Sequence, residues 1–274
     1  MLELIKLFIP ERIKIPLREA RNYFSCLFGL DVKNIPLTPP YPVFELSADD
    51  YVLPAGLDSE FAFGSDFMVI AHRGGNLGSE GNTLGALRLA KKIGANIVEI
   101  DIRMSADGYL VLHHDKHLDK SYGYNLLIEN ISKDELADYG ICSLDEVFYT
   151  FPDLGYILDI KVKDKVIVEK LIDLVIKHGI RGNVLFEGYY TYLDSHKYWR
   201  MPRLELSELL KRDDESSKRI ITNAHLDGKI VYASVMPGNL ERMKVLIELG
   251  IDGIMTADIK NLYDIAKNAG VIKY

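Results

Sequence analysis

The sequence of 274 residues is poor in cysteine, in tryptophan and in long apolar runs. Its two cysteines, Cys26 and Cys142, are too few for a disulfide framework and lack the spacing of a zinc site. No run approaches the roughly 18 consecutive apolar residues of a membrane-spanning helix. Residues 1–16 also lack the uninterrupted apolar segment of a secretory signal. These absences predict a cytoplasmic protein without a transmembrane segment and with reduced thiols.

The charge and the composition narrow the possible classes of protein further. The chain carries 33 Lys and Arg against 40 Asp and Glu, a net charge of −7 with neutral histidines. A surface that neutralises many phosphates needs an excess of cations, so nucleic acid is not an expected partner. The apolar fraction of 48% and the charged fraction of 27% are typical of a globular protein with a substantial core. None of these numbers indicates an oligomeric state.

Residues 1–65 differ from the rest of the chain in their prolines. Five lie close together, namely Pro36, Pro39, Pro40, Pro42 and Pro54. Proline interrupts regular hydrogen bonding, which leaves room for one good helix at about Leu17 to Phe28. The sequence therefore predicts an N-terminal extension, residues 1–65, that packs on a domain formed by residues 66–274. The weakly amphipathic stretch Leu2 to Phe8 leaves peripheral membrane contact open, although packing on the protein's own core is the simpler interpretation.

From Phe67 onward, short apolar runs alternate with amphipathic stretches. The predicted strands are Phe67–His72, Asn96–Arg103, Tyr109–His114, Gly155–Lys161, Asn183–Glu187, Lys229–Val235 and Asp252–Thr256, with an eighth at Arg203–Leu206 or Arg219–Thr222. The predicted helices are Thr83–Ile93, Asp164–His178, Asn239–Leu249 and Asp258–Asn268. Glycines 94, 179 and 250 follow three of these helices as stop signals, and Asn239 and Asp258 are candidate N-caps.

This alternation predicts the α/β class. Without a dinucleotide-binding fingerprint it favours a closed (β/α)8 barrel over an open doubly wound sheet. One connection departs from the pattern, because only five residues separate Arg103 from Tyr109 and they include the turn signal Asp107-Gly108. We therefore expect the third strand to enter by a hairpin or an extended return, which would distort the barrel.

Three carboxylates occupy one face of two predicted strands. Alternation places Glu99, Asp101 and Arg103 on the same face, and it places Asp159 beside Lys161 on a later strand. Carboxylates this close repel one another unless a cation lies between them, and oxygen ligands suit Mg²⁺ or Ca²⁺. The pattern predicts one divalent cation held by Glu99, Asp101 and Asp159. A solvent-facing acidic strand and a surface ion pair are the alternative interpretations.

Two histidines stand at predicted strand ends. His72 and Arg73 precede two glycines, which would let the backbone approach an anionic group such as a phosphate. In the later run, alternation puts His114 on the face of Leu112 and His113 on the opposite face, so only one of this pair can face a site. Histidines and carboxylates together supply an acid, a base and a Lewis acid site, with Arg73 and Lys161 as candidate phosphate-binding cations.

These residues resemble the motifs of the glycerophosphodiester phosphodiesterase family, over about Phe67 to Asn268. The matching motifs are His72-Arg73-Gly74, Asn82-Thr83-Leu84, Gly94-Ala95, Glu99-Ile100-Asp101, Asp107-Gly108, His114-Asp115, Leu158-Asp159-Ile160-Lys161 and the run Leu249 to Thr256. The resemblance implies a TIM barrel that hydrolyses a small phosphodiester to a phosphomonoester and an alcohol. It also implies His72 and His114 as the acid/base pair and Glu99, Asp101 and Asp159 as metal ligands.

Four positions depart from the family pattern. Gly81 stands where Glu is usual, and Asp159 stands where Glu is more common. Glu187-Gly188-Tyr189 replaces a usual Ser-Phe, and Ser234 replaces a common Trp, where the alcohol part of a substrate would bind. Three other functions remain open: a cyclising lyase of the phospholipase D toxin type, a phosphodiesterase acting on an envelope or capsule precursor, and a non-catalytic barrel that binds a phosphorylated partner.

Overall fold

The computed structural model describes residues 66–75, 81–118, 126–162, 164–180, 184–188, 198–200, 214–228 and 230–272. The predicted N-terminal extension and its packing on residues 66–274 lie outside these ranges, as does the candidate eighth strand at Arg203–Leu206. Both stay predictions.

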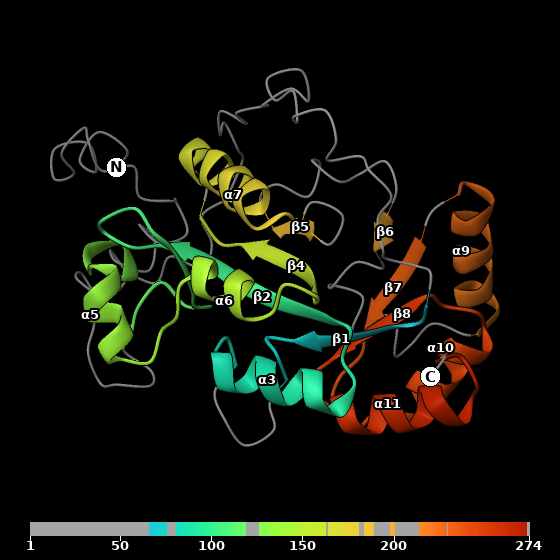
Figure 1. Cartoon of the computed structure of the whole chain (residues 1–274). Helices are drawn as coiled ribbons and strands as arrows, with labels where there is room; N and C mark the ends of the chain where they lie inside the picture. The colour runs from blue at the N-terminus through green and yellow to red at the C-terminus, as the bar shows by residue number, and fades with distance from the viewer. Residues whose placement is uncertain are drawn as a thin grey trace, which may run out of the picture. The chain divides into compact units, whose positions relative to one another are not determined.

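A single sheet organises the described residues (Figure 1). Its strands are β1 (Met68–His72), β2 (Ile97–Met104), β3 (Leu110–Leu112), β4 (Gly155–Ile160), β5 (Val184–Gly188), β6 (Tyr198–Arg200), β7 (Ile230–Ser234) and β8 (Gly253–Thr256). Their order is β5-β4-β2-β1-β8-β7-β6, and every neighbour in this order is parallel. The last strand along the chain thus pairs with the first. That pairing is the signature of a (β/α)8 barrel, because β1 of a doubly wound sheet has other neighbours.

Helices follow the strands along the chain. They are α3 (Leu84–Ile93), the 3₁₀ helix η2 (Ile128–Asn130), α5 (Lys133–Asp138), α6 (Leu144–Thr150), α7 (Lys165–His178), α9 (Asp214–Leu226), α10 (Leu240–Glu248) and α11 (Ile259–Asn268). Ser132 and Ser143 begin α5 and α6 with capping boxes, in which each serine hydroxyl accepts a bond from the backbone of a glutamate three residues later. Helix α11 lies against β1 and β8 and beside α3 (Figure 1).

Most predicted elements are confirmed to within two residues, and the exceptions have local causes. Strand β3 runs antiparallel to β2, as the short connection at Asp107-Gly108 predicts, and Gly108 takes a positive φ of 82° in that turn. The candidate strand Arg219–Thr222 is wrong, because these residues lie inside α9. Their short β-branched run imitates a strand, but Ile221 instead marks the buried stripe of a helix. Asn239 caps α10 as predicted, whereas the Asp258 side chain makes no capping bond to α11.

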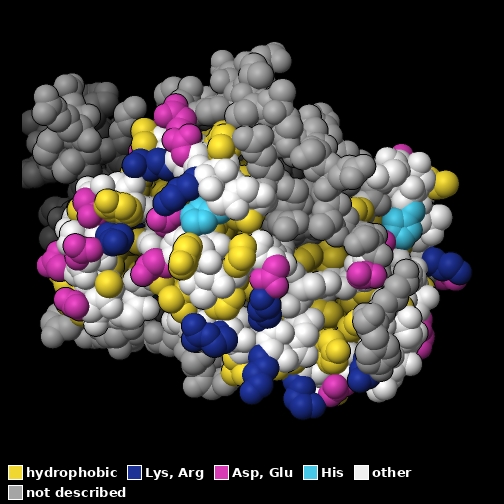
Figure 2. Space-filling model, viewed as in Figure 1, with side chains coloured by type: hydrophobic (Ala, Val, Ile, Leu, Met, Phe, Trp, Pro, Cys, Tyr) yellow, Lys and Arg dark blue, Asp and Glu magenta, His cyan; other side chains and the backbone are white. Residues whose placement is uncertain are grey.

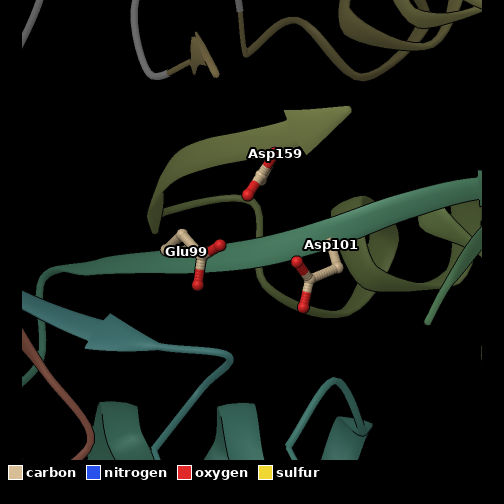
Figure 3. A group of neighbouring side chains, drawn as sticks. All are labelled: Glu99, Asp101 and Asp159. Carbon is tan, nitrogen blue, oxygen red and sulfur yellow. The ribbon is translucent and has the colours of Figure 1, made fainter. Parts of the chain in front are cut away.

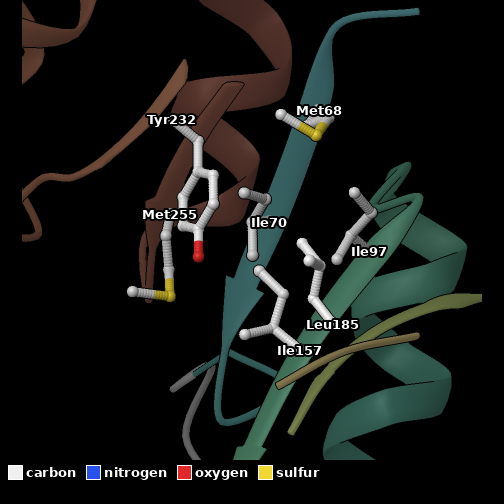
Figure 4. Packing of buried hydrophobic residues seen from close by; sticks show 7 residues of the cluster. All are labelled: Met68, Ile70, Ile97, Ile157, Leu185, Tyr232 and Met255. Carbon is white, nitrogen blue, oxygen red and sulfur yellow. The ribbon is translucent and has the colours of Figure 1, made fainter. Parts of the chain in front are cut away.

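The apolar core fills the barrel interior beneath the C-terminal strand ends. Seven buried side chains from six strands form it: Met68, Ile70, Ile97, Ile157, Leu185, Tyr232 and Met255 (Figure 4). Register places Glu99 beside His72 and Ile157, and it places Asp101, Asp159 and Glu187 on the next level towards the C-terminal ends. The interior therefore changes from apolar to charged along the strand direction, and active sites of such barrels lie at this end.

The surface adds two observations. None of the described helices is long and apolar enough to cross a membrane. On one face, Figure 2 shows basic side chains gathered over α3 and side chains of both signs around α6 and α7. This face has the mixed charge expected from the composition.

Candidate active site

The three predicted metal ligands lie together. Glu99 and Asp101 come from β2 and Asp159 comes from β4, and Figure 3 shows Asp159 directed towards the two side chains of β2. One carboxylate oxygen of each lies within 4.8 Å of the others, and the three residues are 0%, 0% and 4% exposed. A solvent-facing acidic strand and a surface ion pair are therefore excluded. Three buried carboxylates this close require cations among them.

Lys161 and Arg73 supply two of those cations. Lys161 Nζ lies 2.9 Å from Asp101 Oδ1 and 2.5 Å from Asp159 Oδ2, so it bridges the two strands. Arg73 Nε lies 3.1 Å from Asp101 Oδ2, and the Arg73 backbone N–H donates to Glu99 Oε2 at 2.9 Å. Burial raises the pKa of Asp101, but Lys161, Asn82 and Arg73 outweigh it and hold that pKa below its usual range. Burial lowers the pKa of Lys161, yet Asp101 and Asp159 raise it above its usual range.

Asn82 belongs to the site, although the sequence analysis predicted no role for it there. Its Nδ2 donates to Asp101 Oδ2 at 2.8 Å, and the Asp101 backbone N–H donates to its Oδ1 at 3.0 Å. Asn82 takes a left-handed φ of 62° and Arg73 one of 55°, and the Asn82 N–H donates to the Arg73 carbonyl. Asparagine tolerates this conformation better than most residues, so the asparagine itself was the signal in the sequence for a left-handed residue at position 82.

Gly81 explains one departure from the family pattern. A Cβ at this position would lie 2.6 Å from Arg73 Cβ and 2.9 Å from the Arg73 carbonyl oxygen. No side chain fits there without a shift of the backbone that carries Arg73. The glutamate usual at this position is therefore incompatible with the local packing of this chain.

The two predicted histidines lie at the same end of the barrel. His72 ends β1, and its Nε2 lies 3.7 Å from Glu99 Oε2. His114 follows β3, and its Nδ1 lies 2.9 Å from Asp115 Oδ1. His113 bonds the Asp115 carbonyl through Nδ1 at 2.6 Å, and burial lowers its pKa. Because β3 ends at Leu112, strand alternation does not extend to this pair, and the chain beyond the strand decides which histidine faces the site.

A cavity of about 500 Å³ opens beside these groups. Its lining residues are Arg103, His114, Asp115, Lys116, Asp159, Ile160 and Lys161. His114 lines it and His113 does not, which agrees with the sequence-based choice between them. Arg103 and Lys116 add two cations to this wall that the sequence did not assign to the site.

Glu187 extends the row of carboxylates onto β5. It pairs in register with Asp159, is 1% exposed, and its Oε1 accepts a bond from the Tyr232 hydroxyl at 2.8 Å. The sequence identified Glu187 only as a departure where the alcohol part of a substrate would bind. The structure places it on the level of Asp101 and Asp159 and ties it to β7.

The acidic cluster has the composition of a site for a hard divalent cation. Its donors are carboxylate oxygens, which Mg²⁺ and Ca²⁺ prefer. Three carboxylates outnumber the two fixed cations Arg73 and Lys161, so the buried groups carry a net negative charge that a divalent cation would offset. Glu99, Asp101 and Asp159 therefore fit such an ion.

Sequence comparisons relate this site to a known family. Residues 72–180 match the model of the Glycerophosphoryl diester phosphodiesterase family. A glycerophosphodiester phosphodiesterase of Caldanaerobacter subterraneus is 24% identical over 244 residues, which cover 74% of this chain and 99% of that protein. The human lysophospholipase D GDPD1 is 30% identical over 142 residues, but these cover only 43% of this chain and 45% of the human protein.

Solved structures share the barrel. A glycerophosphodiester phosphodiesterase from Thermotoga maritima matches with a TM-score of 0.61 at 21% identity, over 72% of this chain and 98% of its own. A phosphodiesterase from Oleispira antarctica, solved with the product sn-glycerol-3-phosphate, matches with a TM-score of 0.59 at 20% identity, over 74% of this chain and 97% of its own. The family match over the site residues and the common barrel lead to one conclusion: in its site and in its fold the chain is similar to the glycerophosphodiester phosphodiesterases, which are phosphoric diester hydrolases.

Proposed function

We propose that this protein hydrolyses small glycerophosphodiesters to a phosphomonoester and an alcohol, with a divalent cation and two histidines. The observation that carries the proposal is the buried group Glu99, Asp101 and Asp159, with Lys161 and Arg73 against it and both histidines at the same end of the barrel. An acid, a base and anion-binding groups would thus lie at one end of the barrel.

The cations of the site would bind the phosphodiester. When bound by Glu99, Asp101 and Asp159, the divalent ion would supply Lewis acid chemistry to a phosphate oxygen. Arg73 and Lys161 would offer N–H donors to the nonbridging oxygens, where negative charge develops. The arginine fork fits two phosphate oxygens, whereas lysine acts as a point charge.

The histidines would move the two protons of the reaction. One accepts a proton from the attacking oxygen, and the other donates one to the leaving alkoxide. If that oxygen belongs to water, the phosphomonoester forms directly; if it belongs to a neighbouring hydroxyl of the substrate, water then opens the cyclic phosphate to the phosphomonoester. The Asp115 carboxylate can only accept a hydrogen bond when ionised, so the His114 Nδ1 must donate to it at 2.9 Å. Neutral His114 then has its lone pair on Nε2, which suits it to begin the reaction as the base. His72 would take the role of the acid.

The alcohol part of the substrate would contact a different side chain in this protein from the one usual in related enzymes. Glu187, hydrogen-bonded to Tyr232, presents a carboxylate on the level of Asp159 where a serine is usual in the family. A carboxylate prefers a partner with hydroxyl or ammonium donors. The glycerol moiety meets this need, and so do the more polar head groups of envelope precursors.

A substrate and metal screen tests the proposal. The protein is stripped of metal, Mg²⁺, Ca²⁺ and Mn²⁺ are added separately, and glycerophosphodiesters, lysophospholipids and bis-glycosyl phosphodiesters are offered in turn. Phosphorus NMR should show a phosphomonoester that forms only when a divalent cation is present. Undiminished turnover in excess chelator would contradict the metal requirement.

The same spectra separate the alternatives. A cyclic phosphate that persists as the end product would indicate a lyase of the phospholipase D toxin type. Turnover confined to bis-glycosyl phosphodiesters would indicate an envelope precursor. Binding of metal and diester without turnover of any of them would indicate a non-catalytic phosphate-binding barrel.

A further inference from the structure

Arg103 is a cation of the active-site wall, and two of its donors are directed at backbone. It lies two residues after Asp101 on β2, so its side chain shares the face of Glu99 and Asp101. Its Nε donates to the His114 carbonyl oxygen at 3.0 Å, and its Nη2 donates to the same oxygen at 2.7 Å. A carbonyl oxygen has two lone pairs and can accept both bonds.

A second tether holds the same segment to β2. The His113 backbone N–H donates to the Asp101 carbonyl at 3.1 Å, one step past the last register pair of β3, which joins Leu112 to Ile102. Beyond this point the chain leaves the ladder. The two hydrogen bonds from the guanidinium group of Arg103 hold the next residue, His114, to β2 as well.

The two tethers connect His114 to the strand that bears the carboxylates. Glu99 and Asp101 are fixed by the pairing of β2 with β1 and β4, whereas His114 stands outside every strand. The separation between the histidine and the carboxylates therefore depends on how rigidly this segment is held to β2. Misplacement of a catalytic group by about 1 Å can cost a factor of about 10² in rate.

We propose that Arg103 is a positioning residue that sets the place of His114, rather than a ligand of the substrate phosphate. The inference rests on the proposed acid/base role of His114. Its geometric basis is independent of that role, because two donors of the Arg103 fork, Nε and Nη2, are directed at one backbone oxygen. Arg73 and Lys161 remain the phosphate-binding cations.

A double-mutant cycle tests the inference in the full-length protein with its metal. The variants are Arg103→Met, His114→Ala and the combination, and Arg88→Met on the exposed surface of α3 is the matched control. If Arg103 acts through His114, Arg103→Met should lower kcat by about 10² and change KM by less than about threefold. In the His114→Ala background, the same substitution should cost almost nothing more, because residues that act as a unit are not additive.

Three outcomes would overturn the inference. Losses that multiply in the double variant, or a KM that rises tenfold or more at constant kcat, would make Arg103 a phosphate ligand. Turnover of Arg103→Met equal to that of Arg88→Met would show that Arg103 has no role in catalysis. If Arg103→Met unfolds, judged by its thermal melting curve, Arg103→Lys takes its place in the cycle, since lysine keeps the charge but not the fork.

The His114→Ala variant alone distinguishes this inference from the proposed function. Full activity of His114→Ala would contradict the role of His114 and the Arg103 inference with it. An inactive His114→Ala beside a fully active Arg103→Met would overturn only the inference about Arg103. Metal binding, measured by calorimetry with Mn²⁺, should be the same in Arg103→Met and in the unaltered protein.

Discussion

The two halves of the sheet, on either side of β1, carry different side chains towards the interior. On one half, β2, β4 and β5 present Glu99, Asp101, Asp159 and Glu187 near their C-terminal ends. On the other half, β7 and β8 present Tyr232 and Met255, which belong to the apolar core. We call them the carboxylate half and the apolar half.

This difference has a physical cause. Buried carboxylates are tolerated only when they share cations and hydrogen-bond donors at short distance, so they gather on neighbouring strands. Lys161 can bridge Asp101 and Asp159 because β2 and β4 are adjacent and in register. Both halves contribute to the apolar core beneath the carboxylates, and the Tyr232 hydroxyl of the apolar half donates to Glu187 of the carboxylate half. Substitutions in the carboxylate half should therefore affect turnover, and substitutions in the apolar half should affect stability.

The largest effect is expected at Glu99. Glu99→Gln keeps the shape but removes one charge from the acidic cluster, and the loss of several kcal/mol of transition-state stabilisation should lower turnover by about 10⁴. Glu187→Gln is the comparison variant, because Glu187 is equally buried but is not part of the cluster: it should change KM through the alcohol part of the substrate and leave the metal dependence of turnover unchanged. Steady-state rates against metal concentration measure both. Equal losses of turnover in the two variants would show that Glu99 contributes no more to catalysis than a buried carboxylate outside the cluster.

The next effect distinguishes His114 from His113. His114→Ala should lower turnover by 10² to 10⁴, roughly the value of a general acid or base. His113→Ala should cost much less, because His113 bonds backbone and does not line the cavity. Comparison of the two kcat values decides. A larger loss of kcat in His113→Ala than in His114→Ala would mean that His113, and not His114, is the histidine of the site.

The apolar half should respond in stability. Met255→Ala removes a fully buried side chain from the core and should lower the free energy of unfolding by about 2 to 5 kcal/mol. Urea unfolding measures this loss, and kcat of the folded fraction should stay close to that of the unaltered protein. A large loss of kcat without a loss of stability would mean that this half also shapes the site.

Asn82 offers a smaller and more local test of the carboxylate half. Asn82→Asp replaces the Nδ2 donor to Asp101 with a repelling carboxylate and should weaken metal affinity by about 10- to 100-fold. Asn96→Asp is the control: Asn96 bonds Phe67 and Val69 at the opposite strand ends, so its change should cost stability alone. Metal titration of activity and thermal melting separate the two. Unchanged metal affinity in Asn82→Asp would count against the cluster as the metal site.

The smallest effect concerns a charge cluster outside the site. Asp145 on α6 bonds Lys177 and His178 on α7. The bond from Lys177 has the larger effect and the bond from His178 the next, and together they hold the pKa of Asp145 below its usual range. A lowered pKa in the folded state means that this stabilisation is complete above the usual Asp pKa and is lost as the pH falls through the folded value. Because the group is largely exposed, Asp145→Asn should cost less than about 1 kcal/mol near pH 7. Unfolding curves at pH 7 and pH 3 should show a smaller difference between the proteins at the lower pH.

Local patterns account for what was predictable. Alternation on β2 placed Glu99 and Asp101 on one face, glycines located the C-terminal ends of α3 and α7, and Asn239 located the start of α10, because these features depend on neighbours in the chain. Helices α5 and α6 were missed although their capping boxes are readable in the sequence. The candidate strand Arg219–Thr222 failed because a short apolar run has no period long enough to exclude a helix.

The sequence by itself determined the α/β alternation, the candidate acid/base and metal-ligating residues and the family resemblance. Only the tertiary structure decided which groups meet: Lys161 between two carboxylates, Asn82 on Asp101, Glu187 on Tyr232, and Arg103 on the carbonyl of His114. These contacts depend on the register between strands and on left-handed residues at the site. Register is set by pairing across the sheet, between residues far apart in the chain, so no local pattern contains it.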